Sequence, residues 1–274
     1  MRPFWGIVLR ELQRLRHQKA RILSGLARPL LWLFLLGSGV GAIAAGADAA
    51  AYRRFLLPGI LGMVLLFGAM FGALSTVHDR EFGVIRLLLI APVRRTTLVL
   101  AKIASSCSVA LVQAGVLLTL LPVLGISPEP ARLALLLGAM ALTGLAISAL
   151  GMLLATRVDS LENFSGIVNF VLLPMLFLSG ALYPVRALPG ALRIGAALNP
   201  LTYGVDLMKH AAFSGPSFAR AGGGLDPRFR PELHPALDAA VLAATFGAAL
   251  ALTTLLFDRE ARLTRRVAGR EAVG

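Results

Sequence analysis

The chain has 274 residues, of which 57% are hydrophobic and only 15% are charged, and its mean hydropathy is +0.78. Soluble domains carry about 25% charged residues, so this composition indicates a protein that is dissolved in lipid. The formal net charge of +13 would suit nucleic-acid binding, but the basic residues flank apolar stretches and form no soluble basic face, which argues against a nucleic-acid partner.

Residues 1–28 are predicted to form an amphipathic helix that lies on the cytoplasmic membrane surface. At 100° per residue, Phe4 and Trp5 fall on one side of such a helix, and Arg10 and Arg14 fall on the other. Anionic membrane lipid is the expected partner of its basic side.

An alternative interpretation of the N-terminus is a cleaved signal peptide over residues 1–47. Ala45-Gly46-Ala47 has the small side chains of a cleavage site. A basic head of 28 residues followed by a long apolar stretch fits a signal peptide poorly. We therefore expect the first apolar stretch to remain as a membrane span.

Six apolar stretches are each long enough to cross a membrane, because a hydrocarbon layer of ~30 Å takes about 20 helical residues. None shows the polar alternation of a transmembrane β-barrel. The predicted fold class is therefore an all-α polytopic membrane protein, formed as a single transmembrane domain over 1–274. The predicted spans are 29–47, 55–78, 98–123, 131–156, 163–183 and 236–257.

The distribution of basic residues predicts the orientation of these spans. Residues 1–28 hold seven basic residues and one acidic residue, Glu11, which places the N-terminus in the cytoplasm. Six crossings return the tail, 258–274, to the same side, and put the loop 79–97 inside as well. Arginine greatly outnumbers lysine, which suggests a bacterial source and hence the cytoplasmic (inner) membrane.

The segment 184–235, between the fifth and sixth spans, is predicted to be extracytoplasmic. Asn199-Pro200 is typical of a helix start, with Asn as the cap and Pro at the first helical position. Asp206, Lys209 and His210 then share one helix face. These patterns predict one or two short re-entrant or interfacial helices before the last span.

The sequence contains no pattern for an energy source or a reaction of its own. The uncharged windows of these stretches, which are 29–47, 55–78, 103–128, 133–156, 163–185 and 239–257, contain no Asp, Glu, Lys or Arg, and only His78 lies at the edge of one. This absence disfavours transport driven by a proton or sodium gradient. The three lysines follow Gln18, Ala101 and Met208, so no phosphate-binding loop is present. We therefore expect no enzyme activity, no cofactor and no metal site, and any ATP to be bound by another polypeptide.

A membrane-embedded enzyme is the alternative to that expectation. Its polar cluster would have to be built from uncharged residues of the spans, such as Gln113 and Asn169. The four histidines, His17, His78, His210 and His234, show no metal-ligand spacing.

The loop after the second span is predicted to form a helix of two to three turns over residues 78–90, which Pro92 ends. Phe82 is expected to face inward, with Glu81 and Arg86 facing outward. A compact helix with both charge signs, fixed to two spans, can transmit movement from a docked partner. The alternative is an ordinary charged connector.

These residues carry a resemblance to a known family. The run Arg80–Arg95, REFGVIRLLLIAPVRR, resembles the loop between the second and third spans in type-2 permeases of ATP-binding-cassette (ABC) exporters. Leu178–Pro184, LSGALYP, and Leu198–Asp206, LNPLTYGVD, resemble the same family's segment after the fifth span. Together with the six-span layout, the resemblance covers nearly the whole chain.

The resemblance implies a permease subunit that works as a homodimer, or as a heterodimer with a similar permease, and binds a separate cytoplasmic ABC ATPase. It also implies roles for two sets of residues, although their glycines and prolines would equally set turns. The set assigned to coupling with the ATPase is Glu81, Phe82, Gly83, Arg86 and Pro92. The set assigned to an external gate region is Pro184, Asn199, Pro200, Tyr203 and Asp206.

The composition of the spans bears on the cargo. Sugar faces stack on aromatic rings, and only 7% of the residues are aromatic. A lipid-like or hydrophobic small-molecule cargo is therefore favoured over a glycan. Two alternatives stay open: a glycan-exporting permease of the same family, and a membrane scaffold or assembly factor that transports nothing.

Overall fold

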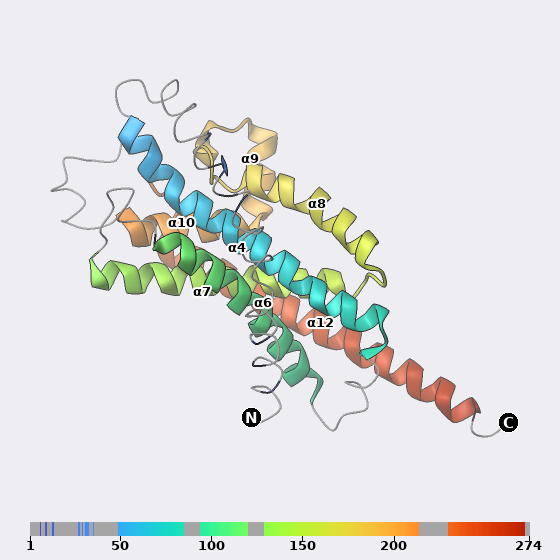
Figure 1. Cartoon of the computed structure of the whole chain (residues 1–274). Helices are drawn as coiled ribbons and strands as arrows, with labels where there is room; N and C mark the ends of the chain where they lie inside the picture. The colour runs from blue at the N-terminus through green and yellow to red at the C-terminus, as the bar shows by residue number, and fades with distance from the viewer. Residues whose placement is uncertain are drawn as a thin grey trace.

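Figure 1 shows a computed structural model of the chain, in which every described element is a helix. The structure describes residues 49–84, 94–119, 129–213 and 230–271, together with isolated positions between 6 and 35. Apart from those positions, the predicted N-terminal helix and first span lie outside the described residues. For the described part of the chain, the predicted all-α fold class is confirmed.

Five of the described helices are long and apolar enough to cross a membrane, and they coincide with the second to sixth predicted spans. The chain is therefore a multi-pass membrane protein. The helices in chain order are α4 (Ala49–Glu81), α6 (Arg95–Leu118), α7 (Pro130–Ala155), α8 (Leu161–Leu178), the 3-10 helix η3 (Val185–Ala187), α9 (Gly190–Leu198), α10 (Pro200–Phe213) and α12 (Pro235–Glu271).

Helix α4 is the core of the bundle. It is apolar around its whole circumference, which is typical of a helix buried on every side. It packs against α6, α7, α8 and α10 (Figure 1). Helix α12 completes the bundle by packing against α6, α7 and α10, and its Phe257 is buried in a second cluster with Ile103 and Met152.

The contacts around α4 depend on small residues at the crossing points. A Cβ added to Gly72 would lie 2.8 Å from the Cα of Ser106 in α6. A Cβ added to Gly59 would overlap the carbonyl oxygen of Ala181, just after α8, and lie 2.7 Å from its carbonyl carbon. Close backbone approach of this kind is what small residues permit between helices in a membrane.

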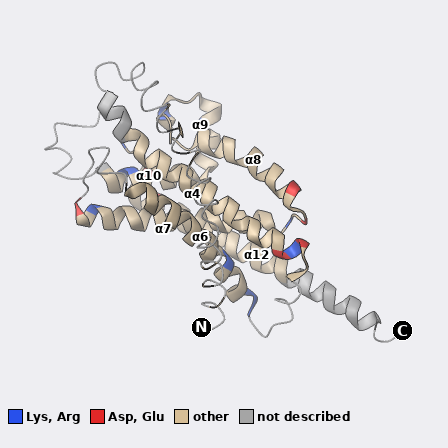
Figure 2. Ribbon diagram, viewed as in Figure 1, with Lys and Arg blue, Asp and Glu red and all other residues tan. Residues whose placement is uncertain are grey.

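Helix α8 lies at the edge of the bundle, and the other described helices leave one of its apolar faces uncovered. Phe170 is 79% exposed, and Ile167 and Leu173 on the same helix are exposed too. Figure 2 shows that the charged residues gather mainly towards the helix ends, so the middle of the bundle presents an apolar surface. That surface suits lipid or a second membrane protein.

The close approach at Gly59 gives a first prediction. We expect Gly59→Ala to lower the melting temperature in detergent, because the new methyl group meets backbone atoms that cannot rotate away. Overpacking of this kind costs about 1–3 kcal/mol. Gly247→Ala in α12 is the matched control, since its Cβ would meet nothing within 4 Å. A melting temperature equal to that of the control would contradict the predicted clash.

Candidate functional site

Three of the residues assigned to ATPase coupling, Glu81, Phe82 and Gly83, lie at the end of α4. The helix runs through His78 and Asp79 to Glu81 and ends in a turn at Phe82 and Gly83. The predicted helix over 78–90 is therefore wrong as a single element. Gly83 explains the break, because its φ of +72° is the left-handed conformation in which a terminal glycine stops a helix.

Phe82 points away from the bundle instead of into it. Its side chain is 66% exposed, and its ring lies 4.4 Å from that of His78, measured between centroids. The predicted inward orientation is wrong: the N–H of Phe82 still donates to the carbonyl oxygen of His78 at 3.1 Å, so the residue keeps the helical register, and its side chain lies on the exposed face next to His78. Arg86 and Pro92, the other two residues of this set, lie outside the described residues.

The end of α4 is bound to the turn between α7 and α8. The Oε2 atom of Glu81 accepts a hydrogen bond from the backbone N–H of Leu161, the first residue of α8, at 3.2 Å. Arg80 donates from Nη1 to the carbonyl oxygen of Thr156 at 2.8 Å and to Oδ1 of Asp159 at 3.3 Å. The α4 terminus is therefore attached to the α7–α8 turn and to the start of α8.

A buried ion pair joins the same part of α4 to α6. Lys102 donates from Nζ to Oδ2 of Asp79, and both side chains are almost fully buried. Sequence reasoning did not pair these two residues because Asp79 lies in the predicted loop and Lys102 in the next predicted span. The available signal was the position of Lys102 as the fifth residue of the predicted span 98–123.

The residues assigned to the external gate form a separate group around α10. Asn199 joins α10 to the end of α8: its Nδ2 donates to the carbonyl oxygen of Met175 at 2.7 Å, and its Oδ1 accepts from the N–H of Leu201 at 3.1 Å. α10 begins at Pro200, as the Asn-Pro pair predicts. One side chain thus caps α10 and ties it to α8.

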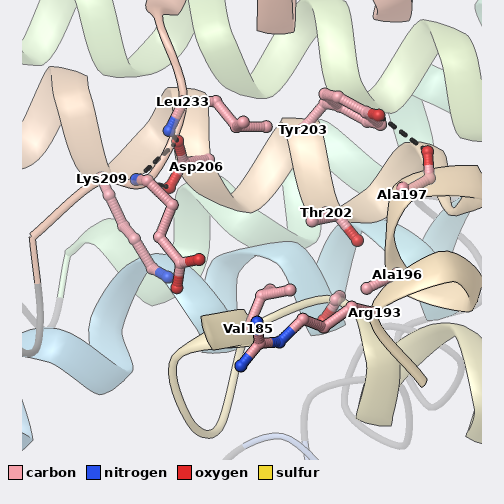
Figure 3. Close-up of a pocket in the computed structure, with 11 residues that line it drawn as sticks. Val185, Arg193, Ala196, Ala197, Thr202, Tyr203, Asp206, Lys209 and Leu233 are labelled. Carbon is pink, nitrogen blue, oxygen red and sulfur yellow. Dashed lines mark hydrogen bonds between the residues drawn. The ribbon is translucent and has the colours of Figure 1, made fainter. Parts of the chain in front are cut away.

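Pro184 and Tyr203 shape the connections around α10. Pro184 directly precedes η3, and the Tyr203 hydroxyl donates to the carbonyl oxygen of Ala197 in α9 at 2.7 Å (Figure 3). Tyr203 therefore holds the α9–α10 corner together.

Asp206 has the densest contacts of this group. Its carboxylate accepts the backbone N–H of Glu232 at 3.0 Å and that of Leu233 at 2.9 Å, ahead of α12. The Nε2 atom of His210 lies 2.7 Å from the carbonyl oxygen of Leu233. Asp206 and His210 therefore fix the entry into α12 against α10.

Lys209 lies beside Asp206 on α10 and is also buried. Its Nζ donates to the carbonyl oxygen of Gly180 at 3.0 Å and lies 4.7 Å from the ring centroid of Phe55. Burial lowers the pKa of the Lys209 ammonium, and the carboxylates of Asp206 and Glu232 oppose that shift. The ammonium is thus held by a carbonyl dipole, an aromatic face and neighbouring acids.

The structure shows the predicted helix face that Asp206, Lys209 and His210 share. However, α10 lies inside the bundle and does not lie as an amphipathic helix on a membrane surface. Leu201 and Val205 are buried on its apolar side as well. The helix packs against α4, α7 and α12 at once. Its polar residues are therefore structural partners of other segments.

A cavity of about 120 Å³ opens beside α10. Figure 3 shows Asp206, Lys209 and Leu233 on one side of it and Val185 and Arg193 on the other. Ligand sites for small organic molecules measure about 300–1,000 Å³, so this cavity suits water or an ion more than a cargo. Sequence reasoning missed Arg193 and Glu232 in this lining because they come from separate segments.

The comparisons with known proteins agree with this architecture. Residues 2–213 match the family described as ABC-2 type transporter. Nodulation protein J of Rhizobium leguminosarum bv. viciae is 31% identical over 192 residues, which are 69% of this chain and 74% of that protein. The putative transport permease ycf38 of Pyropia yezoensis is 29% identical over 205 residues, 73% of this chain and 70% of that protein.

Nodulation protein J of Rhizobium meliloti (strain 1021) is also 31% identical, over 199 residues that cover 72% of this chain and 76% of that protein. Fold and relatives together define a multi-pass membrane permease. The chain belongs to the ABC-2 type transporter family. The family resemblance predicted from the coupling loop and the segment after the fifth span is confirmed.

The buried ion pair gives a second prediction. We expect Asp79→Asn and Lys102→Met each to destabilise the protein by about 3–5 kcal/mol, because each removes one charge of a buried ion pair and leaves the opposite charge in place. The double variant should recover most of that loss. Melting temperatures and yields of all four proteins in detergent form the test. Purely additive losses in the double variant would show that the two charges do not act as a pair.

Proposed function

We propose that the chain is the permease subunit of an ABC exporter, driven by a separate cytoplasmic ATPase. The family match over residues 2–213 carries this proposal. ATP is bound by the partner subunit, and the chain itself acts as a transport subunit without a catalytic site or a nucleotide cofactor. The bacterial cytoplasmic membrane is its location, with both termini on the cytoplasmic side.

The translocation pathway forms between two copies of the permease. The cavity of about 120 Å³ inside one chain is too small for an organic cargo. The exposed apolar face of α8, with Phe170 and Leu173, offers a surface that a second copy or lipid covers. A homodimer is the simplest arrangement that supplies such a partner, because copies of one chain are always available to each other.

The α4 terminus is the element that receives the ATPase. Phe82 is an exposed aromatic residue at a helix end that is fixed by Glu81 to α8 and by Asp79 to α6. In protein interfaces, the residues that contribute most of the binding energy are often aromatic side chains held in a fixed position. Force applied there reaches two membrane helices directly.

The cargo is lipid-like or a hydrophobic small molecule. The outward faces of α8 and α12 present large aliphatic side chains, including Leu173, Leu252 and Leu255. A pathway bounded by such faces favours apolar cargo over heavily hydroxylated cargo, because polar groups there would be left without hydrogen-bond partners.

The third prediction tests the ATPase contact. We expect Phe82→Ala to weaken ATPase association by about tenfold or more, since it removes the exposed anchor and no core contact. The measurement is tagged purification from native membranes, followed by mass-spectrometric quantification of a copurifying polypeptide that contains a phosphate-binding loop.

The matched control for this experiment is Leu198→Ala. Leu198 is 81% exposed at the end of α9, which adjoins the opposite end of α8. It should leave ATPase recovery unchanged. Equal recovery of the ATPase with Phe82→Ala would refute the coupling assignment. Failure of the reconstituted pair to show any cargo-stimulated ATP hydrolysis would instead support a non-transporting scaffold.

A further inference from the structure

Three potential metal ligands converge between α10 and α12. Asp206, His210 and Asp238 each offer one ligand atom, and these atoms all lie within 4.8 Å of one another. Asp206 and His210 are one turn apart on α10, and Asp238 lies in the first turn of α12. The cluster thus joins the re-entrant helix to the last span.

Asp238 is the unexplained member of this cluster. Its side chain is 0% exposed, and neither carboxylate oxygen has a hydrogen-bond partner among the residues that the structure describes. A buried carboxylate without partners is costly, so such a group in a native fold calls for a bound species that satisfies it.

The charges around Asp238 do not balance within the protein. Among the described residues, Glu232 pairs with Arg186, and the two buried carboxylates of Asp206 and Asp238 lie near one buried ammonium, that of Lys209. That ammonium is directed to the Gly180 carbonyl and the Phe55 ring. A negative charge therefore remains for a cation at the Asp238 carboxylate.

We propose that Asp206, His210 and Asp238 bind a divalent metal ion of the Zn²⁺ or Mn²⁺ class. Two carboxylates and one imidazole form a mixed oxygen and nitrogen donor set, which these ions accept. In the structure, Nε2 of His210 lies 2.7 Å from the carbonyl oxygen of Leu233, so the imidazole donates a hydrogen bond to that oxygen. Metal binding exchanges this hydrogen bond for a metal–Nε2 bond, and the neutral imidazole then carries its proton on Nδ1.

Metal binding draws α10 and α12 together. Ligand atoms around Zn²⁺ lie about 2.0–2.2 Å from the ion, which places neighbouring donors roughly 3.4 Å apart. The ligand atoms of the three residues, which lie within 4.8 Å of one another in the structure, therefore move closer together when the ion binds. The ion then fixes the start of the last span to the helix that carries Tyr203 and Lys209.

The fourth prediction is a direct metal-binding test. The full chain, purified without a histidine tag and stripped with EDTA, is equilibrated with ZnCl₂, MnCl₂ or MgCl₂. We expect one Zn²⁺ or Mn²⁺ per chain by elemental analysis, and a higher melting temperature with either ion than with Mg²⁺. Asp238→Asn and His210→Gln should each weaken binding by roughly tenfold or more.

Matched controls separate ligation from general damage. Asp159→Asn removes an exposed carboxylate at the turn between α7 and α8, and it should bind the ion as the unmodified chain does. Without metal, Asp238→Asn should melt at or above the unmodified chain, because it removes an unbalanced buried charge. Absence of stoichiometric Zn²⁺ and Mn²⁺ from the unmodified chain, or undiminished binding by Asp238→Asn, overturns the proposal.

Discussion

Close packing of α4 against its neighbours holds both ends of the permease in place. Gly59 and Gly72 let adjoining backbone approach this helix, so its position leaves little freedom. At one end, Phe55 lies beneath the Lys209 ammonium; at the other, Asp79 pairs with Lys102. The residues proposed for coupling and those proposed for the gate region therefore adjoin the same closely packed helix.

The buried charges correct one part of the sequence interpretation. The prediction that the spans lack ionisable groups is wrong, because Lys102 belongs to α6 and Asp238 to α12. Both lie near the end of an apolar stretch and fold inward, where the bundle brings other polar groups close. The assignment to ATP-driven transport consequently rests on the family match and not on the absence of charge.

The cluster of Asp206, His210 and Asp238 shows why local motifs were insufficient. The first two share a helix face that the sequence predicts, but Asp238 is 28 residues beyond His210 and belongs to the next helix. A search for ligand spacing within one segment cannot find a site that two helices build together. The expectation of no metal site followed from that search, and the proposed cation site revises it.

The sequence itself determined which segments span the membrane and where α10 starts. The described spans follow from hydropathy, and the start of α10 at Pro200 follows from the Asn-Pro pair. These features depend on each segment's own backbone and on its transfer into lipid. The outward position of Phe82, the Asp79–Lys102 pair and the burial of α10 were decided only by tertiary structure. Each depends on which side chains of distant segments meet, and neither hydropathy nor spacing along one segment contains that information.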